Sequence, residues 1–86
     1  MRRTVLIVDD HEGFRSAARA LLEAEGFHVV GEAVDGREAL TKVEHLQPDV
    51  VLLDIQLPNL DGFAVAERLA IDARATAVVL ISSHDA

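Results

Sequence analysis

The sequence contains no cysteine, no tryptophan and no tyrosine, and it has only three phenylalanines and two prolines. Without cysteine, disulfides and thiolate-bound metals are excluded. Half of the 86 residues are nevertheless apolar, which is typical of a globular chain rather than a disordered one. The length limits the chain to one small domain, and its core must be built from Val, Leu, Ile and Ala.

Positive charge is also scarce, with eight Lys and Arg against fifteen Asp and Glu and a formal charge of −7. Such a surface repels phosphate backbones, so we expect no nucleic-acid binding by this segment. The apolar run at residues 5–8 is too short for a signal peptide, and no later run reaches the length needed to span a membrane. We therefore expect a soluble, cytoplasmic protein without membrane contact.

Short apolar runs rich in β-branched residues alternate with segments of helical periodicity. The runs predict strands over residues 4–8, 27–33, 50–53 and 77–81. Three helices are predicted between them, with the following inward residues: Phe14, Ala17, Ala18, Leu21 and Leu22; Ala39, Leu40, Val43 and Leu46; Phe63, Ala66, Leu69 and Ala70. Strands that alternate with helices predict an α/β fold with a parallel sheet and helices on both faces.

Helix boundaries are indicated by a few residues of special chemistry. Gly26 stands where a glycine would end the first helix. Asp35 and Glu38, three residues apart, resemble a capping pair at the start of the second, and Pro48 prevents that helix from continuing.

Carboxylates follow two of the predicted strands. Asp9 and Asp10 come after the first strand, and Asp54 comes after the third. Because the carboxyl ends of parallel strands share one edge of a sheet, we expect these three acids to meet in one cleft. Two carboxylates about 5 Å apart repel by roughly 3 kcal/mol at an effective dielectric near 20, so a cation is needed to compensate. Oxygen ligands favour Mg²⁺ or Mn²⁺, and metal-assisted phosphoryl chemistry is the natural interpretation.

Polar residues near that cleft have plainer explanations as well. Ser82 follows the fourth strand, where it would either cap the backbone or donate to a phosphoryl oxygen. The four histidines show no ligand spacing and are interpreted as surface or loop residues. His11 and His84 flank the predicted cleft, where they would either modulate access or bind a metal adventitiously.

Together, Asp9-Asp10, Asp54, Ser82 and the segment 54–62, with its Pro58 and Gly62, resemble the receiver domains of two-component response regulators. The resemblance extends over all 86 residues and implies a flavodoxin-like (CheY-like) doubly wound sheet of strand order 2-1-3-4(-5). Residues 9–11 and 30–36 further resemble regulators that carry a C-terminal helix-turn-helix DNA-binding domain.

The resemblance implies a role for each site residue. Asp54 would accept a phosphoryl group from a sensor histidine kinase. Mg²⁺ (or Mn²⁺) would be held by Asp10 directly, by Asp9 largely through water, by Asp54 and by the backbone carbonyl of Gln56. Ser82 would contact the phosphoryl group and transmit the change to an output domain. The chain would then be a switch in a transcription regulator, and not an enzyme.

The chain also departs from the family pattern. A complete receiver continues with a helix, a strand and a helix, and that strand ends in a lysine; the sole lysine here, Lys42, falls in the second predicted helix. Residues 1–86 are thus predicted to be an incomplete receiver domain. The fourth strand should lie at an open sheet edge, where we expect either dimerisation or continuation into a longer chain.

Two other function classes stay open. A metal-dependent phosphatase with an aspartate nucleophile also places carboxylates at strand ends, but it usually needs an Asp-x-Asp pair, and Asp9 and Asp10 are adjacent. A purely structural interaction module would keep the fold but lose the acid cluster. Turnover of a phosphate ester would favour the first class, and absence of any Mg²⁺ dependence would favour the second.

Overall fold

The computed structural model describes residues 2–58, 61–73 and 75–82 of the chain. Seven elements alternate between strand and helix in the predicted order, and the last one is a strand. They are β1 (Thr4–Val8), α1 (Glu12–Ala24), β2 (His28–Ala33), α2 (Gly36–Leu46), β3 (Val50–Asp54), α3 (Gly62–Asp72) and β4 (Ala77–Ile81). Strand β2 begins one residue later than predicted, because the backbone N–H of Phe27 donates to the carbonyl of Leu22 at the end of α1.

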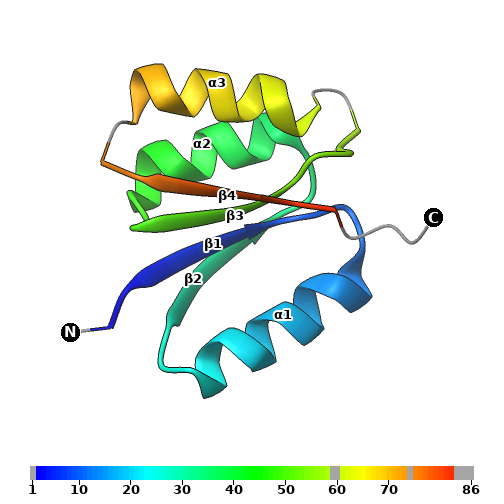
Figure 1. Ribbon diagram of the computed structural model, residues 1–86, viewed down its shortest axis with the longest axis vertical. Helices are drawn as coiled ribbons and strands as arrows, with labels where there is room; N and C mark the ends of the chain where they lie inside the picture. Colours follow the sequence, from blue (N-terminus) through cyan, green and yellow to red (C-terminus); the bar gives the residue numbers. More distant parts are fainter. Residues whose placement is uncertain (1, 59–60, 74, 83–86) are drawn as a thin grey trace.

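The four strands form one parallel sheet in the order β2-β1-β3-β4, which confirms the predicted fold class. Figure 1 shows α2 and α3 on one face of the sheet and α1 on the other. The carboxyl ends of the strands therefore meet at one edge. In the register of β1 and β3, Val8 lies beside Leu53, so the next residues of the two segments, Asp9 and Asp54, also lie beside each other.

The main core lies between the sheet and the α2/α3 layer. Strands β1 and β3 are central and have helices on both faces of the sheet, so a continuous apolar sequence suits them. The buried cluster is Leu6, Val8, Ala33, Ala39, Val43, Val51, Leu53, Val65 and Leu69.

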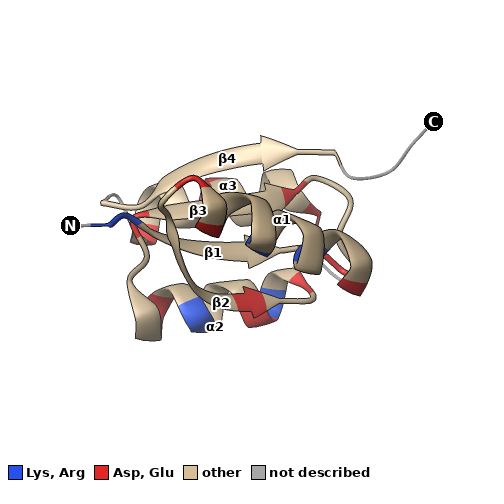
Figure 2. Ribbon diagram, turned by 90° about the horizontal axis from the view of Figure 1, so that it is seen from below, with Lys and Arg blue, Asp and Glu red and all other residues tan. Residues whose placement is uncertain are grey.

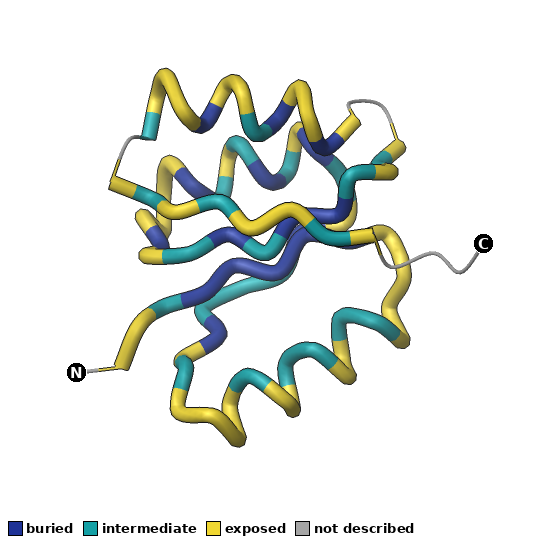
Figure 3. The backbone as a smooth tube through the Cα atoms, in the orientation of Figure 1, coloured by how far each residue is buried: buried dark blue, intermediate teal, exposed yellow. Residues whose placement is uncertain are grey.

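The opposite face is more thinly covered, because α1 alone packs there among the described elements (Figure 3). Ala18 and Leu22 pack against Val5, Ile7 and Val29, but α1 has no fully buried residue. The predicted inward stripe of α1 is wrong for two members, since Ala17 is exposed and Leu21 is 65% exposed. One helix contacts the sheet along a narrow line, and its flanks remain in solvent.

Helix α3 packs in a different rotation from the predicted one. Phe63 is 62% exposed and Ala70 is also exposed, so both inward assignments are wrong. The buried residues are Gly62, Val65 and Leu69, spaced at three and four residues. Gly62 faces the chain of β3 so closely that a Cβ there would lie 2.4 Å from the carbonyl oxygen of Asp54. This contact fixes the rotation of α3 and turns Phe63 outward.

Helix α2 and the predicted helix ends agree well with the structure. In α2, Ala39 and Val43 are buried and Leu40 is partly buried, as predicted. Leu46, in the last turn, is 42% exposed, so its inward assignment is wrong. The Asp35 side chain accepts from the backbone N–H of Glu38 at 2.8 Å, as the capping pair predicts. The predicted glycine after α1, Gly26, has φ of +95°, a backbone conformation that glycine adopts without strain.

The two outer strands differ from the central ones in exposure. Strand β4 lies at the edge of the described sheet, as predicted, and Val79 and Leu80 are 46% and 39% exposed.

Within the described part of the chain, no helix combines the length and apolarity needed to cross a membrane.

Candidate functional site

Two buried aspartates lie side by side at the carboxyl edge of the sheet. Asp9 directly follows β1, and Asp54 is the last residue of the neighbouring strand β3. Both residues are 0% exposed. Charged side chains are rarely buried to this extent unless they are paired or bind a cation, so their position demands a functional or electrostatic explanation.

Asp10 and His11 complete the group. One potential ligand atom from each of Asp9, Asp10, His11 and Asp54 lies within 4.8 Å of the others. The structure thus brings together the three carboxylates that the sequence predicts to meet. Asp10 and His11 are partly exposed, with side chains 35% and 49% accessible, so the group opens to solvent on their side.

His11 is held by several contacts to the two preceding aspartates. Its backbone N–H donates to Oδ1 of Asp9 at 2.8 Å, and its ring Nδ1 lies 3.0 Å from the same oxygen. The same Nδ1 is also 3.0 Å from Oδ1 of Asp10. The sequence places His11 only at the flank of the cleft, whereas the structure places its imidazole within the acid group.

The loop after β3 holds Asp54 in place. The backbone N–H of Gln56 donates to Oδ1 of Asp54 at 3.0 Å, and the N–H of Ile55 donates to the carbonyl of Ile81 on β4 at 2.9 Å. The N–H of Gly62 closes the loop on the carbonyl of Ile55 at 3.0 Å. Asn59 and Leu60 of this loop lie outside the described residues.

Ser82 is the first residue after β4 and is exposed. Its neighbour Ile81 pairs with Asp54 in the register of β3 and β4. The backbone of Ser82 therefore lies at the same sheet edge as the acid group. His84 lies outside the described residues.

A charged network that the sequence interpretation missed supports the site from the α1 side. Arg15 donates from Nη1 to the backbone carbonyl of Asp9 at 2.8 Å and from Nε to Glu32 at 2.9 Å. Arg19 donates to the other oxygen of Glu32 at 2.8 Å, and Lys42 donates to the backbone carbonyl of Glu32. Figure 2 shows the basic segments of α1 and α2 near the acidic segment of β2.

Glu32 is stabilised as a carboxylate by this network. The hydrogen bond from Arg19 is the largest influence and holds the pKa of Glu32 below its ordinary value, and Arg15 acts in the same direction. The available sequence signal was the spacing of Arg15 and Arg19, which lie four residues apart and so share a helix face. That spacing does not tell which strand residue they meet.

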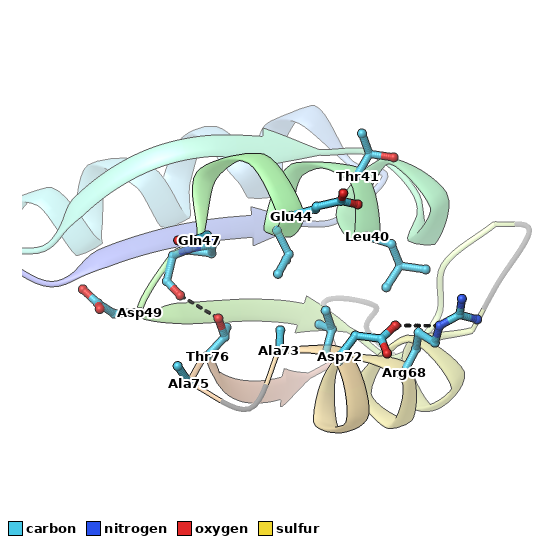
Figure 4. Close-up of a pocket in the computed structure, with 13 residues that line it drawn as sticks. Leu40, Thr41, Glu44, Gln47, Asp49, Arg68, Asp72, Ala73, Ala75 and Thr76 are labelled. Atoms are coloured by element: carbon cyan, nitrogen blue, oxygen red, sulfur yellow. Dashed lines mark hydrogen bonds and ion pairs between the residues drawn. The ribbon is translucent and has the colours of Figure 1, made fainter.

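A groove of about 720 Å³ lies elsewhere, between α2 and α3 near the amino ends of β3 and β4 (Figure 4). None of the four residues of the acid group lines it. Arg68, the only basic residue among the described residues that line it, is already paired with Asp72 at 2.8 Å. The acid group therefore lies away from this groove, at the opposite edge of the sheet.

The acid group fits a hard divalent cation. Its three carboxylates supply the oxygen ligands that Mg²⁺ and Mn²⁺ prefer, and the exposed side leaves room for water or phosphate oxygens. A cation there would offset the mutual repulsion of the carboxylates. A doubly wound α/β domain with its ligand site at the carboxyl edge is the class that this fold and site define.

Comparison with known proteins assigns the chain within that class. Residues 5–86 match the response regulator receiver domain family, and the chain belongs to that family. It is thus a receiver domain of the two-component response regulators.

Relatives of known type support this assignment. A protein-glutamate methylesterase/protein-glutamine glutaminase of Myxococcus xanthus is 50% identical over 80 residues, which are 92% of this chain and 23% of that protein. The positive alginate biosynthesis regulatory protein of Pseudomonas aeruginosa is 45% identical over 83 residues, covering 94% of this chain and 34% of that one. The chain thus spans about a quarter to a third of the length of these relatives.

A solved structure shows the same fold. The crystal structure of the CheX–CheY–BeF3–Mg²⁺ complex from Borrelia burgdorferi matches with a TM-score of 0.89 and 31% identity. The match covers 95% of this chain and 63% of that one.

Proposed function

We propose that the chain accepts a phosphoryl group from a sensor histidine kinase on Asp54, in a reaction that requires Mg²⁺ or Mn²⁺. The observation that carries the proposal is the burial of Asp54 beside the oxygen atoms of Asp9 and Asp10. In the transfer, the P–N bond of the kinase phosphohistidine breaks and a P–O bond forms to the Asp54 carboxylate. The electron pair of the broken bond returns to the kinase imidazole.

Asp10, Asp9, Asp54 and the backbone carbonyl of Gln56 are the proposed metal ligands, with Asp9 acting largely through water. When bound, the cation would neutralise carboxylate charge and the charge of phosphoryl oxygens. Esterification adds about one negative charge at Asp54, so this compensation matters most after transfer. The Borrelia structure named above holds Mg²⁺ and BeF3, which supports the same ligand chemistry for this chain.

Ser82 is proposed to hydrogen-bond the phosphoryl group once it is present. Its backbone follows Ile81, the register partner of Asp54, so Ser82 lies at the same sheet edge as the phosphoacceptor. Ser82→Ala should then bind metal like the parent chain and show a smaller spectral change upon phosphorylation.

The chain itself is proposed to be a switch that turns over no substrate and controls an output domain. The Pseudomonas relative named above is a regulatory protein of alginate biosynthesis. A relative from Bordetella pertussis, 46% identical over 69 residues, is named as a transcription regulator of virulence factors, so a DNA-binding output domain elsewhere in the full protein is the favoured candidate. The net charge of −7 argues against direct DNA contact by this segment.

Phosphodonor labelling tests the proposal. Incubation with acetyl phosphate and Mg²⁺, followed by intact-mass analysis, should add one phosphoryl group to the parent chain and none to Asp54→Asn. Asp10→Ala should lower labelling by weakening metal binding. Asp72→Asn, which changes an exposed carboxylate on α3, is the matched control and should label normally. Labelling that persists in Asp54→Asn would refute the assignment.

A further inference from the structure

The imidazole of His11 lies between the two carboxylates proposed to bind the metal. Its Nδ1 is 3.0 Å from Oδ1 of Asp9 and 3.0 Å from Oδ1 of Asp10. The backbone N–H of His11 also donates to Asp9 Oδ1, which restrains the residue at this position. A nitrogen donor therefore stands among the oxygen donors of the site.

The spacing of these atoms suits a single coordination shell. Octahedral ligands at about 2.1 Å from a cation lie about 3.0 Å from their neighbours in the shell. His11 Nδ1 has this separation from both carboxylate oxygens. His11 and Asp10, the proposed direct carboxylate ligand, thus have the spacing of neighbouring ligands of one octahedral ion, while Asp9 is proposed to act largely through water.

We propose that His11 Nδ1 is a ligand that shifts the metal preference of the site from Mg²⁺ toward late first-row dications such as Ni²⁺ and Co²⁺. Imidazole nitrogen binds these ions well, whereas Mg²⁺ takes oxygen ligands almost exclusively. As a ligand through Nδ1, the imidazole would carry its ring proton on Nε2, and the His11 side chain is 49% exposed. The inference rests on the proposed function in that both use Asp9 and Asp10.

A plain ion pair is the competing explanation for the same distances. In that case Nδ1–H donates to the two carboxylates and opposes the binding of every cation. Removal of the imidazole would then strengthen the binding of Mg²⁺ and Ni²⁺ by similar factors. The two explanations differ in the ratio of the two affinities, because only a ligand discriminates between the metals.

Isothermal titration of the full chain with Mg²⁺ alone and with Ni²⁺ alone, at one pH, measures this ratio. His11→Gln should weaken Ni²⁺ binding by about tenfold or more and change Mg²⁺ binding by less than about threefold. His45→Gln is the matched control, because its ring lies on α2, where Nδ1 is 3.0 Å from the carbonyl of Thr41, and not in the acid group. Thermal melts without metal show whether each variant is folded.

The proposal would be overturned if His11→Gln changed the affinities for Mg²⁺ and Ni²⁺ by equal factors. It would also be overturned if His45→Gln lost Ni²⁺ affinity to the same extent as His11→Gln. Acetyl phosphate labelling is measured on the same samples to separate this proposal from the proposed function. If the parent chain is not phosphorylated by acetyl phosphate but its ratio of Ni²⁺ to Mg²⁺ affinity depends on His11, the proposed function is refuted and the His11 proposal stands. If the parent chain is phosphorylated at Asp54 but His11→Gln changes both metal affinities by equal factors, the His11 proposal is refuted and the proposed function stands.

Discussion

Arg15 donates a hydrogen bond from Nη1 to the backbone carbonyl oxygen of Asp9 at 2.8 Å. The same guanidinium is anchored on Glu32 of β2, and its side chain is only 13% exposed. The N–H of Asp9 is bound as well, to the carbonyl of Ala33 at 3.0 Å. Both the N–H and the carbonyl of Asp9 are therefore hydrogen-bonded, which orients the peptide that leads into Asp10.

Arg15→Gln should lower Mg²⁺ affinity by about tenfold, the usual scale for residues that orient metal ligands. Loss of a positive charge beside the site would by itself raise the affinity, so a decrease reports lost orientation. Titration calorimetry with Mg²⁺ measures the effect. Arg19→Gln is the control, because it removes a partner of Glu32 and leaves the Asp9 contact intact. An increase in affinity in Arg15→Gln would show that only charge matters.

Glu32 should make folding stability sensitive to acid. Its pKa is lowered in the folded state, chiefly by Arg19, so the carboxylate form is favoured by folding. The resulting stability is present above the ordinary pKa of 4.5 and is lost as the pH falls toward the lower folded value. The free energy of unfolding, measured with urea from neutral pH into this acid range, should fall less steeply for Glu32→Gln than for the parent chain.

Asp49 should account for part of the acid sensitivity that remains in that variant. The backbone N–H of Thr4 donates to Asp49 and lowers the pKa of this carboxyl group.

The control for Glu32→Gln is Glu44→Gln, which removes one carboxylate at an exposed position of α2. A decline as steep in Glu32→Gln as in the parent chain would contradict the assigned role of the network.

Gly62→Ala should destabilise the fold by about 2 kcal/mol or more through overpacking. A Cβ at this position would lie 2.4 Å from the carbonyl oxygen of Asp54 and 2.5 Å from the Cα of Ile55, and backbone atoms cannot give way cheaply. Gly13→Ala is the control, since its Cβ meets nothing within 4 Å, and it should stabilise α1 by about 0.5–1 kcal/mol. Chemical denaturation compares the two; equal stabilities would contradict the close packing of α3.

The 86-residue chain should self-associate through the edge of β4. Val79 and Leu80 are 46% and 39% exposed on this strand, and an exposed apolar edge offers unpaired backbone groups to another strand. Sedimentation velocity over a range of concentrations should show dimers or larger species, and Val79→Lys should shift the distribution toward monomer. A parent chain that stays monomeric at all concentrations would contradict this prediction.

Local chemistry in the sequence was sufficient to predict the order of elements and several of their ends. The cap of α2 by Asp35 and the glycine after α1 depend on atoms within a few residues, so their signals are readable directly. The meeting of Asp9 with Asp54 also followed, because parallel strands must end at a shared edge.

The tertiary structure alone decided how the elements face one another. The close approach of Gly62 to the backbone of Asp54 turned α3 so that Phe63 is exposed, a rotation that helical periodicity alone does not specify. The contact of Arg15 with the Asp9 carbonyl and the position of His11 within the acid group likewise depend on the tertiary structure. Periodicity and strand order describe each element and the sheet edge, but the rotation of a helix and the target of a long side chain depend on packing between segments distant in sequence.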